Sequence, residues 1–256
     1  HFMQCADVSQ LKPCIFEYVY LARPDSTMDG ISVYQARLNL GETLAKRVIS
    51  VVPPTDIDVI IPIPESSRPS ATQLAHLLGV PYREGFVKNR YVGRTFIMPG
   101  QGVRKKSVRQ KLNVIASEFK GRNVLLVDDS IVRGNTQRAL VKMLKEAGAA
   151  EVHVRISSPP ITWPCFYGID FASRAELIAS GLAVEEVRKS IGADSLGFLS
   201  KAGMIAATNQ QERELCTACF TGEYPIELPA AERLGKNLLE RGVATIREEG
   251  HVHVDE

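Results

Sequence analysis

One short stretch constrains the fold of this chain more than any other, the thirteen residues Val124–Thr136 (VLLVDDSIVRGNT). Its apolar start predicts a strand buried on both faces, and two adjacent carboxylates end that strand. A turn with Gly134 then leads into a helix that Asn135 or Thr136 opens. Ligands of open α/β sheets bind at the carboxyl ends of the strands. The stretch therefore predicts a binding loop at the edge of a parallel sheet.

The residue types in this loop predict a ligand that carries a phosphate together with a sugar or a metal. The turn and the helix start offer unpaired backbone N–H groups and the positive end of a helix dipole, which suit a phosphate. Ser130, Gly134 and Thr136 let the backbone approach closely and add hydroxyl groups. Asp128 and Asp129 would repel a bare phosphate, so we expect a ribose diol or a divalent cation beside them. Two solvated acids at an ordinary strand end are the alternative.

Strand and helix patterns alternate along most of the chain. Extended segments are predicted at residues 15–21, 57–63, 80–86, 124–127 and 152–156. Helices are predicted at residues 36–49, 71–78, 136–147, 175–179 and 184–191, with one more in the tail 230–256. This alternation favours right-handed crossovers between parallel strands. We therefore predict an α/β fold, with a mainly parallel sheet flanked by helices and a helical C-terminal extension.

Composition and charge exclude several classes of protein. The chain has 256 residues, 45% of them hydrophobic, and a formal charge of +2, which does not indicate binding to nucleic acid or to a membrane surface. No apolar run approaches the roughly 20 residues of a membrane helix. The first residues form no basic-then-apolar leader, so we expect a cytoplasmic protein, with a plastid as the alternative. The chain does not begin with Met, which suggests a fragment of a longer polypeptide or a trimmed one.

Two further sequence features carry chemistry. Cys216 and Cys219 form a C-x-x-C pair, and with Cys14 and Cys165 they make four candidate thiolates for a zinc ion or an iron–sulfur cluster. Buried free cysteines are the alternative, and Cys5 is left over. The second feature is the segment 88–111, which holds eight Lys or Arg and no acid. It fits either a solvated basic face or a lid over an anion.

Longer motifs resemble one family. Val124–Thr136 resembles the phosphoribosyl pyrophosphate (PRPP) signature of the type I phosphoribosyltransferases. Four more segments, in the family's order, resemble glutamine PRPP amidotransferases: 15–26 (IFEYVYLARPDS), 61–67 (IPIPESS), 86–100 (FVKNRYVGRTFIMPG) and 165–170 (CFYGID). The resemblance extends from about residue 13 to 225 of this sequence. It implies the type I phosphoribosyltransferase fold.

The resemblance also implies a reaction, in which ammonia attacks C1 of PRPP to give 5-phosphoribosylamine and pyrophosphate. This is the first committed step of purine synthesis. The catalytic residues that it implies are Asp128, Asp129, Arg94 and Tyr91. The implied PRPP-binding residues are Glu65, Ser66, Ser67, Lys88, Ser130, Ile131, Val132, Arg133, Gly134, Asn135 and Thr136. One Mg²⁺ ion would be held by Ser66, Asp128 and Asp129, and the basic segment 88–111 would close over the substrate and exclude water.

The cofactors and partners follow from the same resemblance. Family members that contain a 4Fe–4S cluster share the cysteine pattern of this chain, which implies a cluster on Cys14, Cys165, Cys216 and Cys219. Its expected role is structural, or that of an oxygen-sensitive stability switch. The family also implies a homotetramer and feedback inhibition by purine nucleotides, with no role for nucleic acid.

For domain organisation, we predict a lead-in segment at residues 1–20, the transferase domain at 21–200, and a C-terminal extension that carries the C-x-x-C pair at 201–256. The family places a glutaminase domain before the transferase, and this sequence does not supply it, so we expect activity with ammonia and none with glutamine. Two other functions stay open at this point. One is another type I phosphoribosyltransferase, such as a base-salvage enzyme, and the other is a PRPP-binding regulator of the same fold.

Overall fold

The computed structural model describes residues 10–50, 53–88, 112–169, 171 and 173–226. Several predictions lie outside the described residues. These are the roles of Tyr91 and Arg94, the lid beyond Lys88, the inert Cys5, and the helix in the tail.

A four-stranded parallel sheet forms the centre of the protein, and its strand order is β3-β6-β7-β8. The strands are β3 (Val59–Pro62), β6 (Asn123–Asp128), β7 (Glu151–Ile156) and β8 (Ser195–Phe198). All four residues of β3 are buried, as are five of the six in β6. Nearly continuous apolar strands of this kind are typical of a parallel sheet covered on both faces.

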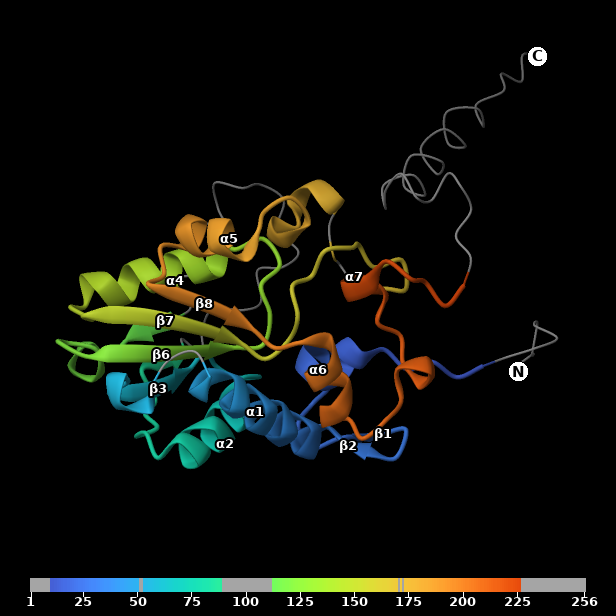
Figure 1. Cartoon of the computed structure of the whole chain (residues 1–256), viewed down its shortest axis with the longest axis horizontal. Helices are drawn as coiled ribbons and strands as arrows, with labels where there is room; N and C mark the ends of the chain where they lie inside the picture. The colour runs from blue at the N-terminus through green and yellow to red at the C-terminus, as the bar shows by residue number, and fades with distance from the viewer. Residues whose placement is uncertain (1–9, 51–52, 89–111, 170, 172, 227–256) are drawn as a thin grey trace, which may run out of the picture.

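Helices cover the two faces of this sheet (Figure 1). On one face lie α1 (Val33–Ile49), α2 (Arg68–Leu78) and α6 (Lys201–Ala207), and on the other lie α4 (Asn135–Glu146) and α5 (Val184–Ile191). Each face has its own apolar cluster. Leu125 and Val127 of β6 pack toward α1, whereas Val124 and Leu126 pack toward α4. The predicted α/β fold with a mainly parallel, helix-flanked sheet is confirmed.

Local chemistry fixes where the first two helices lie. The Ser32 hydroxyl accepts a hydrogen bond from the backbone N–H of Gln35 at 3.3 Å and caps the start of α1. Gly41 of α1 faces the carbonyl of Ser70 in α2, and a Cβ there would lie 2.3 Å from that oxygen. The two helices therefore approach closely only because this position lacks a side chain. This contact holds the start of α2 against α1.

The strand predicted at residues 15–21 is wrong, because Glu17–Leu21 forms a turn of π-helix, η1. The buried guanidinium of Arg37 in α1 explains the difference. Its Nε donates to the carbonyl of Tyr18 at 3.0 Å, and its Nη2 donates to those of Tyr20 at 3.0 Å and Ala22 at 2.8 Å. These carbonyls therefore need no neighbouring strand. The aromatic and β-branched residues of this segment are typical of a strand. Its conformation depends instead on hydrogen bonds from Arg37, which is distant in the sequence.

The remaining elements are short. β1 (Thr27–Met28) pairs antiparallel with β2 (Ile31–Ser32), and β4 (Phe86–Lys88) pairs antiparallel with β5 (Leu112–Val114). Single turns occur at η2 (Pro54–Asp56), η3 (Ala116–Glu118), η4 (Arg174–Glu176), η5 (Ile178–Ser180), η6 (Glu212–Glu214) and α7 (Ala218–Thr221). Of the extended segment predicted at 80–86, only Phe86 lies in a strand. The sequence patterns did not predict β8 or α6.

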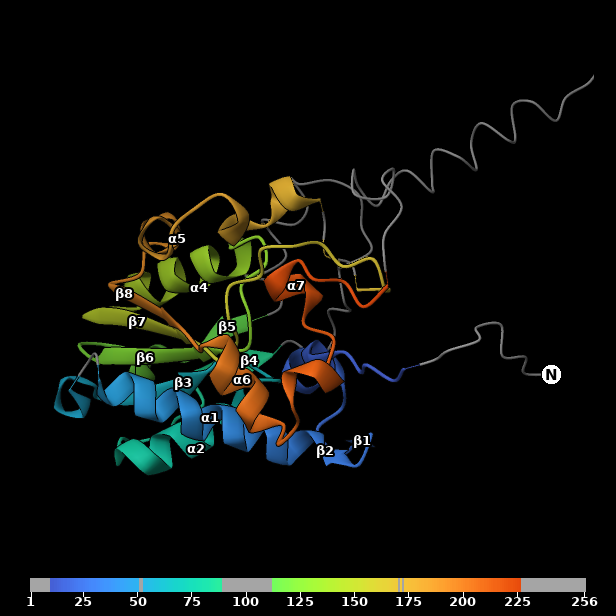
Figure 2. The same cartoon turned by 45° about the vertical axis from the view of Figure 1, so that its right-hand side comes forward.

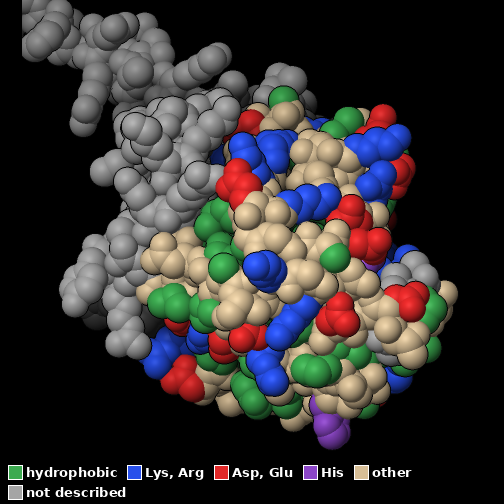
Figure 3. Space-filling model, turned by 90° about the vertical axis from the view of Figure 1, so that its left-hand side faces the viewer, with side chains coloured by type: hydrophobic (Ala, Val, Ile, Leu, Met, Phe, Trp, Pro, Cys, Tyr) green, Lys and Arg blue, Asp and Glu red, His purple; other side chains and the backbone are tan. Residues whose placement is uncertain are grey.

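Two views place the elements relative to one another. In Figures 1 and 2 the N-terminal turn η1 and the segment around α7 lie side by side, beyond the carboxyl ends of the strands. Figure 3 shows the opposite end, where β6 and β7 begin, and acidic and basic side chains are interspersed over it. Among the described helices, none has the length and apolar character needed to cross a bilayer.

Candidate active site at the carboxyl end of the sheet

The turn after β3 and the loop after β6 meet because their strands are neighbours. Pro62 pairs with Val127 across the two parallel strands, and the N–H of Ile63 donates to the carbonyl of Val127 at 2.8 Å. Both segments leave the sheet at its carboxyl edge, where open α/β folds bind their ligands. The two stretches that the sequence singled out, 62–67 and 128–136, are thus brought together.

The two acids of the loop receive hydroxyl groups from three serines. Ser66 donates to Asp129 Oδ2 and Ser130 donates to Asp129 Oδ1, each at 2.5 Å. Ser67 donates to Asp128 Oδ1 at 3.3 Å. The acids themselves are only 5% and 6% exposed. The structure therefore joins the serines predicted for the turn to the carboxylates predicted for the loop.

Gln137 is a residue of this site that the sequence analysis missed. Its Nε2 donates to Asp128 Oδ2 at 2.6 Å and to the carbonyl of Ser130 at 3.1 Å. A signal was present in the sequence, because Gln137 lies on the helical stripe formed with Leu140, Val141 and Leu144, all of them buried. A polar residue on an apolar stripe indicates polar partners inside.

Burial dominates the electrostatics of the acid pair. Burial raises the pKa of Asp128 well above its usual range, and the neighbouring charge of Asp129 raises it further. Burial also raises the pKa of Asp129, while hydrogen bonds from Ser130 and Ser66 and the charge of Arg37 oppose that rise. Two adjacent buried carboxylates repel each other, so a divalent cation or hydroxyl donors from a sugar would stabilise their ionised form.

Gly134 gives the loop its shape. Its φ is +71°, which disfavours residues with a side chain, and a Cβ there would lie 2.7 Å from Ile178 Cδ1. The N–H of Ile178 also donates to the carbonyl of Val132 at 2.9 Å, so η5 holds the loop from outside. Gly134 brings no side chain to cap α4, and the first N–H groups of that helix can therefore reach a ligand.

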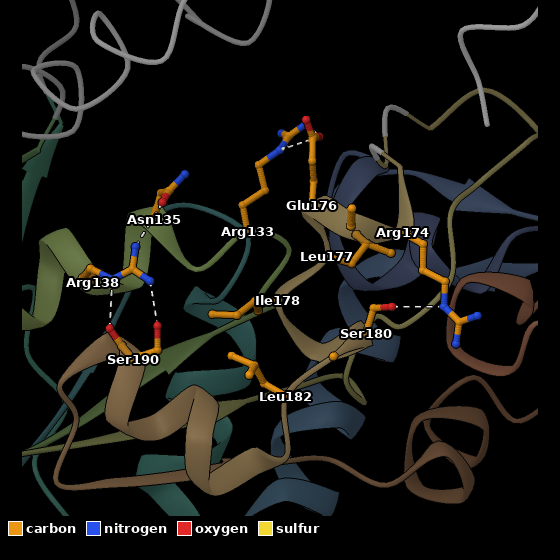
Figure 4. A pocket seen from close by; sticks show the side chains of 12 residues that line it. Arg133, Asn135, Arg138, Arg174, Glu176, Leu177, Ile178, Ser180, Leu182 and Ser190 are labelled. Carbon is orange, nitrogen blue, oxygen red and sulfur yellow. Dashed lines mark hydrogen bonds and ion pairs between the residues drawn. The ribbon is translucent and has the colours of Figure 1, made fainter. Parts of the chain in front are cut away.

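The side chains of several predicted contact residues point away from the acid pair. Ile131 is 1% exposed and Val132 packs against the core, so only their backbones could touch a ligand. Arg133 donates to Glu176 at 2.9 Å, and Asn135 accepts from an arginine of α4 at 3.1 Å. Figure 4 shows both side chains in a groove of about 660 Å³ on the outer side of the loop.

The turn after β3 separates an exposed side chain from a buried one. Glu65 is exposed, and Lys88 lies 3.8 Å from it at the end of β4. Ser67 is 0% exposed, and its hydroxyl serves Asp128. The side chain of Ser67 therefore supports the acid pair, and its predicted contact with PRPP stays a prediction for the backbone. Ser66 is half-buried beside Asp129, as a hydroxyl that could reach a ligand should be.

A second region gathers the four cysteines from distant parts of the chain. Cys14 and Cys216 form an isolated parallel bridge, with the N–H of Ile15 donating to the carbonyl of Cys216 at 3.2 Å. The carbonyl of Cys219 accepts from the N–H groups of Thr162 and Trp163, which shortly precede Cys165, at 3.1 Å each. All four thiols are free, and three of them are at most 8% exposed.

The thiols are close enough to affect one another. Burial raises the pKa of Cys14 to about 11, and charges on Cys216 and Cys165 add to the rise. Burial also raises the pKa of Cys219, followed by charges on the other three thiols. Within the described part of the chain, no three His, Cys, Asp or Glu side chains lie close enough together to hold a single metal ion.

Comparison with known proteins identifies the fold and the family. A family model described as the phosphoribosyl transferase domain matches residues 31–157. The amidophosphoribosyltransferase of Mycobacterium tuberculosis strain H37Rv is 55% identical over 238 residues, which are 91% of this chain and 44% of that protein. The enzyme of Pseudomonas aeruginosa is 55% identical over 225 residues, 86% of this chain and 45% of that one.

Two solved structures agree. One, described as the allosteric regulatory enzyme of purine biosynthesis, matches with a TM-score of 0.78 and 48% identity, over 90% of this chain and 49% of that one. Glutamine PRPP amidotransferase from B. subtilis, complexed with ADP and GMP, matches with a TM-score of 0.77 and 49% identity, over 88% and 49%.

The fold and the loop after β6 define a type I phosphoribosyltransferase domain. More narrowly, the chain belongs to the amidophosphoribosyltransferase family, as its sequence motifs predicted. It spans about half the length of the curated relatives that it matches.

Proposed function

We propose that this chain transfers ammonia to C1 of PRPP, giving 5-phosphoribosylamine and pyrophosphate, the first committed step of purine synthesis. One observation carries the proposal: the buried acid pair Asp128 and Asp129 lies where the loop after β6 meets the turn after β3. Each segment suits one end of PRPP, and the acids lie between them, where the ribose would be. The family relation supports the same reaction.

The geometry supports a separate role for each segment in binding PRPP. The N–H groups of the loop 130–136 and the start of α4 suit the 5′-phosphate. The carboxylates accept the ribose hydroxyls, and the turn 63–67 faces the pyrophosphate. As the C–N bond forms at C1, the C–O bond to pyrophosphate breaks, the pyrophosphate leaves with the electron pair, and the amine loses a proton. Positive charge then develops on the ribose beside the two acids, which stabilise it.

The same residues fit a magnesium ion. Two buried carboxylates and the half-buried hydroxyl of Ser66 form a set of hard oxygen donors, the kind that Mg²⁺ prefers. Asp128, Asp129 and Ser66 would hold the ion. When bound, Mg²⁺ supplies positive charge that stabilises the leaving pyrophosphate.

We also propose that Cys14, Cys165, Cys216 and Cys219 hold a 4Fe–4S cluster. Four free thiols from three separate segments meet in one region, and burial disfavours the thiolates of Cys14 and Cys219 unless a positive group is bound. The cluster would tie these segments together, and its role is structural because the displacement transfers no electron. Iron and acid-labile sulfide in anaerobically purified protein, with a visible absorption band, would support the cluster. Zinc without iron would refute it.

The wider organisation is part of the proposal. Residues 21–200 form the transferase domain, between a lead-in at 1–20 and an extension at 201–256, and the family match at 31–157 and the end of β8 at Phe198 are consistent with these limits. The relative from B. subtilis was solved with ADP and GMP. Purine nucleotides would compete with PRPP here, because the same loop can hold their 5′-phosphates. A homotetramer and a glutaminase partner domain complete the assembly.

The nitrogen donor and the acceptor test this function. Release of pyrophosphate from PRPP and Mg²⁺ is measured with ammonium, with glutamine and with purine bases, and the variant Asp128→Asn/Asp129→Asn is the control. We expect release that depends on ammonium and is absent in the variant. PRPP binding without any release would indicate a regulator, and release that depends on a purine base would indicate a salvage enzyme.

A further inference from the structure

The side chain of Gln137 bridges the start of the binding loop to the helix that follows it. It lies in the first turn of α4 and its side chain is 4% exposed. The two N–H groups of its amide reach both ends of the loop's first turn, Asp128 Oδ2 at 2.6 Å and the carbonyl of Ser130 at 3.1 Å. A single side chain thus connects the end of β6, the start of the loop and the helix that follows.

Because of these hydrogen bonds, the two acids differ in how firmly their side chains are held. Asp128 is held by the amide of Gln137, by the backbone N–H of Asp129 at 2.9 Å, and by the fully buried hydroxyl of Ser67 at 3.3 Å. None of these donors can turn to solvent. Asp129 is held by the hydroxyls of Ser66 and Ser130, which are half-buried and can rotate. Asp128 therefore has its orientation fixed in advance, whereas Asp129 can exchange its partners for those of a ligand.

We propose that Gln137 is a positioning residue, which orients Asp128 toward the ribose of PRPP and sets the curvature of the phosphate loop through the Ser130 carbonyl. This inference rests on the proposed function. It adds a residue that lies just beyond the thirteen-residue motif. Small errors in such geometry matter, because a displacement of about 1 Å can reduce turnover about a hundredfold.

A purely structural role is the competing explanation. Gln137 lies on an apolar stripe with Leu140, Val141 and Leu144, where a methionine of similar size would pack at least as well. The amide of Gln137 instead uses its N–H groups in hydrogen bonds to the loop. If its role were only to satisfy buried acceptors, its loss would reduce stability and leave the kinetics of the folded protein unchanged.

Kinetics and melting separate these explanations. Gln137→Met keeps the size and removes both donors, and Gln137→Glu keeps the shape but faces Asp128 with a second carboxylate. The matched control is Gln35→Met, at an exposed position on α1. We expect kcat/KM for PRPP to fall about 10- to 100-fold in both Gln137 variants, with the KM for ammonia unchanged and the control like wild type. Unchanged kcat/KM in a folded variant would overturn the proposal, and so would failure of both variants to fold.

A double-mutant cycle tests whether Gln137 acts through Asp128. PRPP affinity is measured by calorimetry with Mg²⁺ and without ammonia, for wild type, Gln137→Met, Asp128→Ala and the double variant. We expect the loss caused by Gln137→Met to shrink at least threefold when Asp128 is absent. Additive losses would contradict the inference and leave the proposed function intact. A wild-type chain that binds no PRPP would overturn both.

Discussion

The acid pair and the cysteine region are organised in opposite ways. All four carboxylate oxygens of Asp128 and Asp129 already have a donor within 3.3 Å, and every donor belongs to the loop, to α4 or to the neighbouring turn. The cysteines come from positions 14, 165, 216 and 219, in three separate segments of the chain, and the N–H of Tyr167 donates to Cys165 Sγ at 3.4 Å. The partners of the acid pair are close in sequence or follow the neighbouring strand, whereas the cysteines depend on contacts between distant segments.

The largest effect should come from changes to the acid pair. In Asp128→Asn/Asp129→Asn we expect turnover to fall by about three orders of magnitude or more, because the ribose loses both of its charged partners. The fold should survive, since the amides have the same shape and the repulsion between two buried charges disappears. Pyrophosphate release measures the loss of turnover, and thermal melting by circular dichroism checks that the fold survives. Full activity in this variant would show that the acids are not the site.

The next largest effect should come from the cysteine region. In Cys219→Ser we expect the iron content to fall to near zero and the free energy of unfolding to fall by about 2–5 kcal/mol, because the segments lose their common centre. Iron analysis and chemical denaturation under anaerobic conditions measure this. The acid-pair variant is the matched control, and it should keep its iron. Unchanged stability and metal content in Cys219→Ser would mean that these thiols are merely buried.

Local sequence patterns predicted the acid pair better than the cysteine region. The physical reason is that the parts of the first lie close together along the chain, whereas those of the second are far apart. The loop, its strand and its helix are contiguous, so the apolar run, the two acids and Gly134 could be read together. Their neighbour, the turn after β3, follows from the pairing of parallel strands. Three of the four sheet strands (β3, β6 and β7) and the helices α1, α2, α4 and α5 were predictable for the same reason, since each is a local pattern.

What the sequence could not supply depends on contacts between remote residues. The π-helical turn Glu17–Leu21 is held by Arg37, and no local pattern shows that its carbonyls have such a partner. The bridge between Cys14 and Cys216 likewise follows from no local pattern, and the sequence grouped these cysteines only through the family resemblance. Gln137 is intermediate: its helical stripe was readable, but its acceptors were not.

A smaller effect should come from a change in the shape of the loop that leaves its charges unchanged. In Gly134→Ala we expect a loss of about 1–3 kcal/mol in the free energy of unfolding, because φ is +71° and the new Cβ would meet Ile178 Cδ1 at 2.7 Å. The affinity for PRPP should fall as well, since the N–H groups of the loop move. Chemical denaturation and calorimetry measure the two losses. Gly79→Ala is the control, because φ there is +66° and no atom lies within 4 Å of the added Cβ. Equal losses in both variants would show that backbone strain, and not the contact with Ile178, sets the effect.

The smallest effect is the pH dependence of the acid pair. The pKa values of Asp128 and Asp129 are raised in the folded chain, so the native state binds more protons than the unfolded state between the ordinary value of 3.8 and the raised one. Stability contributed by the pair therefore falls as pH rises through this window. A cation that binds the ionised pair displaces those protons, so the affinity for Mg²⁺ and PRPP should rise with pH, by at most about tenfold per unit for each proton released.

Calorimetry from about pH 5 to about pH 8, in buffers with different ionisation enthalpies, counts the released protons directly. The substrate's own phosphates also titrate, so the Asp128→Asn variant supplies the reference, and the difference between the two proteins is the contribution of the acid. We expect wild type to release more protons than the variant at the lower end of the range. Identical release would mean that the carboxylates are already ionised before the ligand arrives. In that case the hydrogen bonds from Gln137, Ser66 and Ser130 would outweigh burial, and the first region would be even more completely organised in advance than its pKa values indicate.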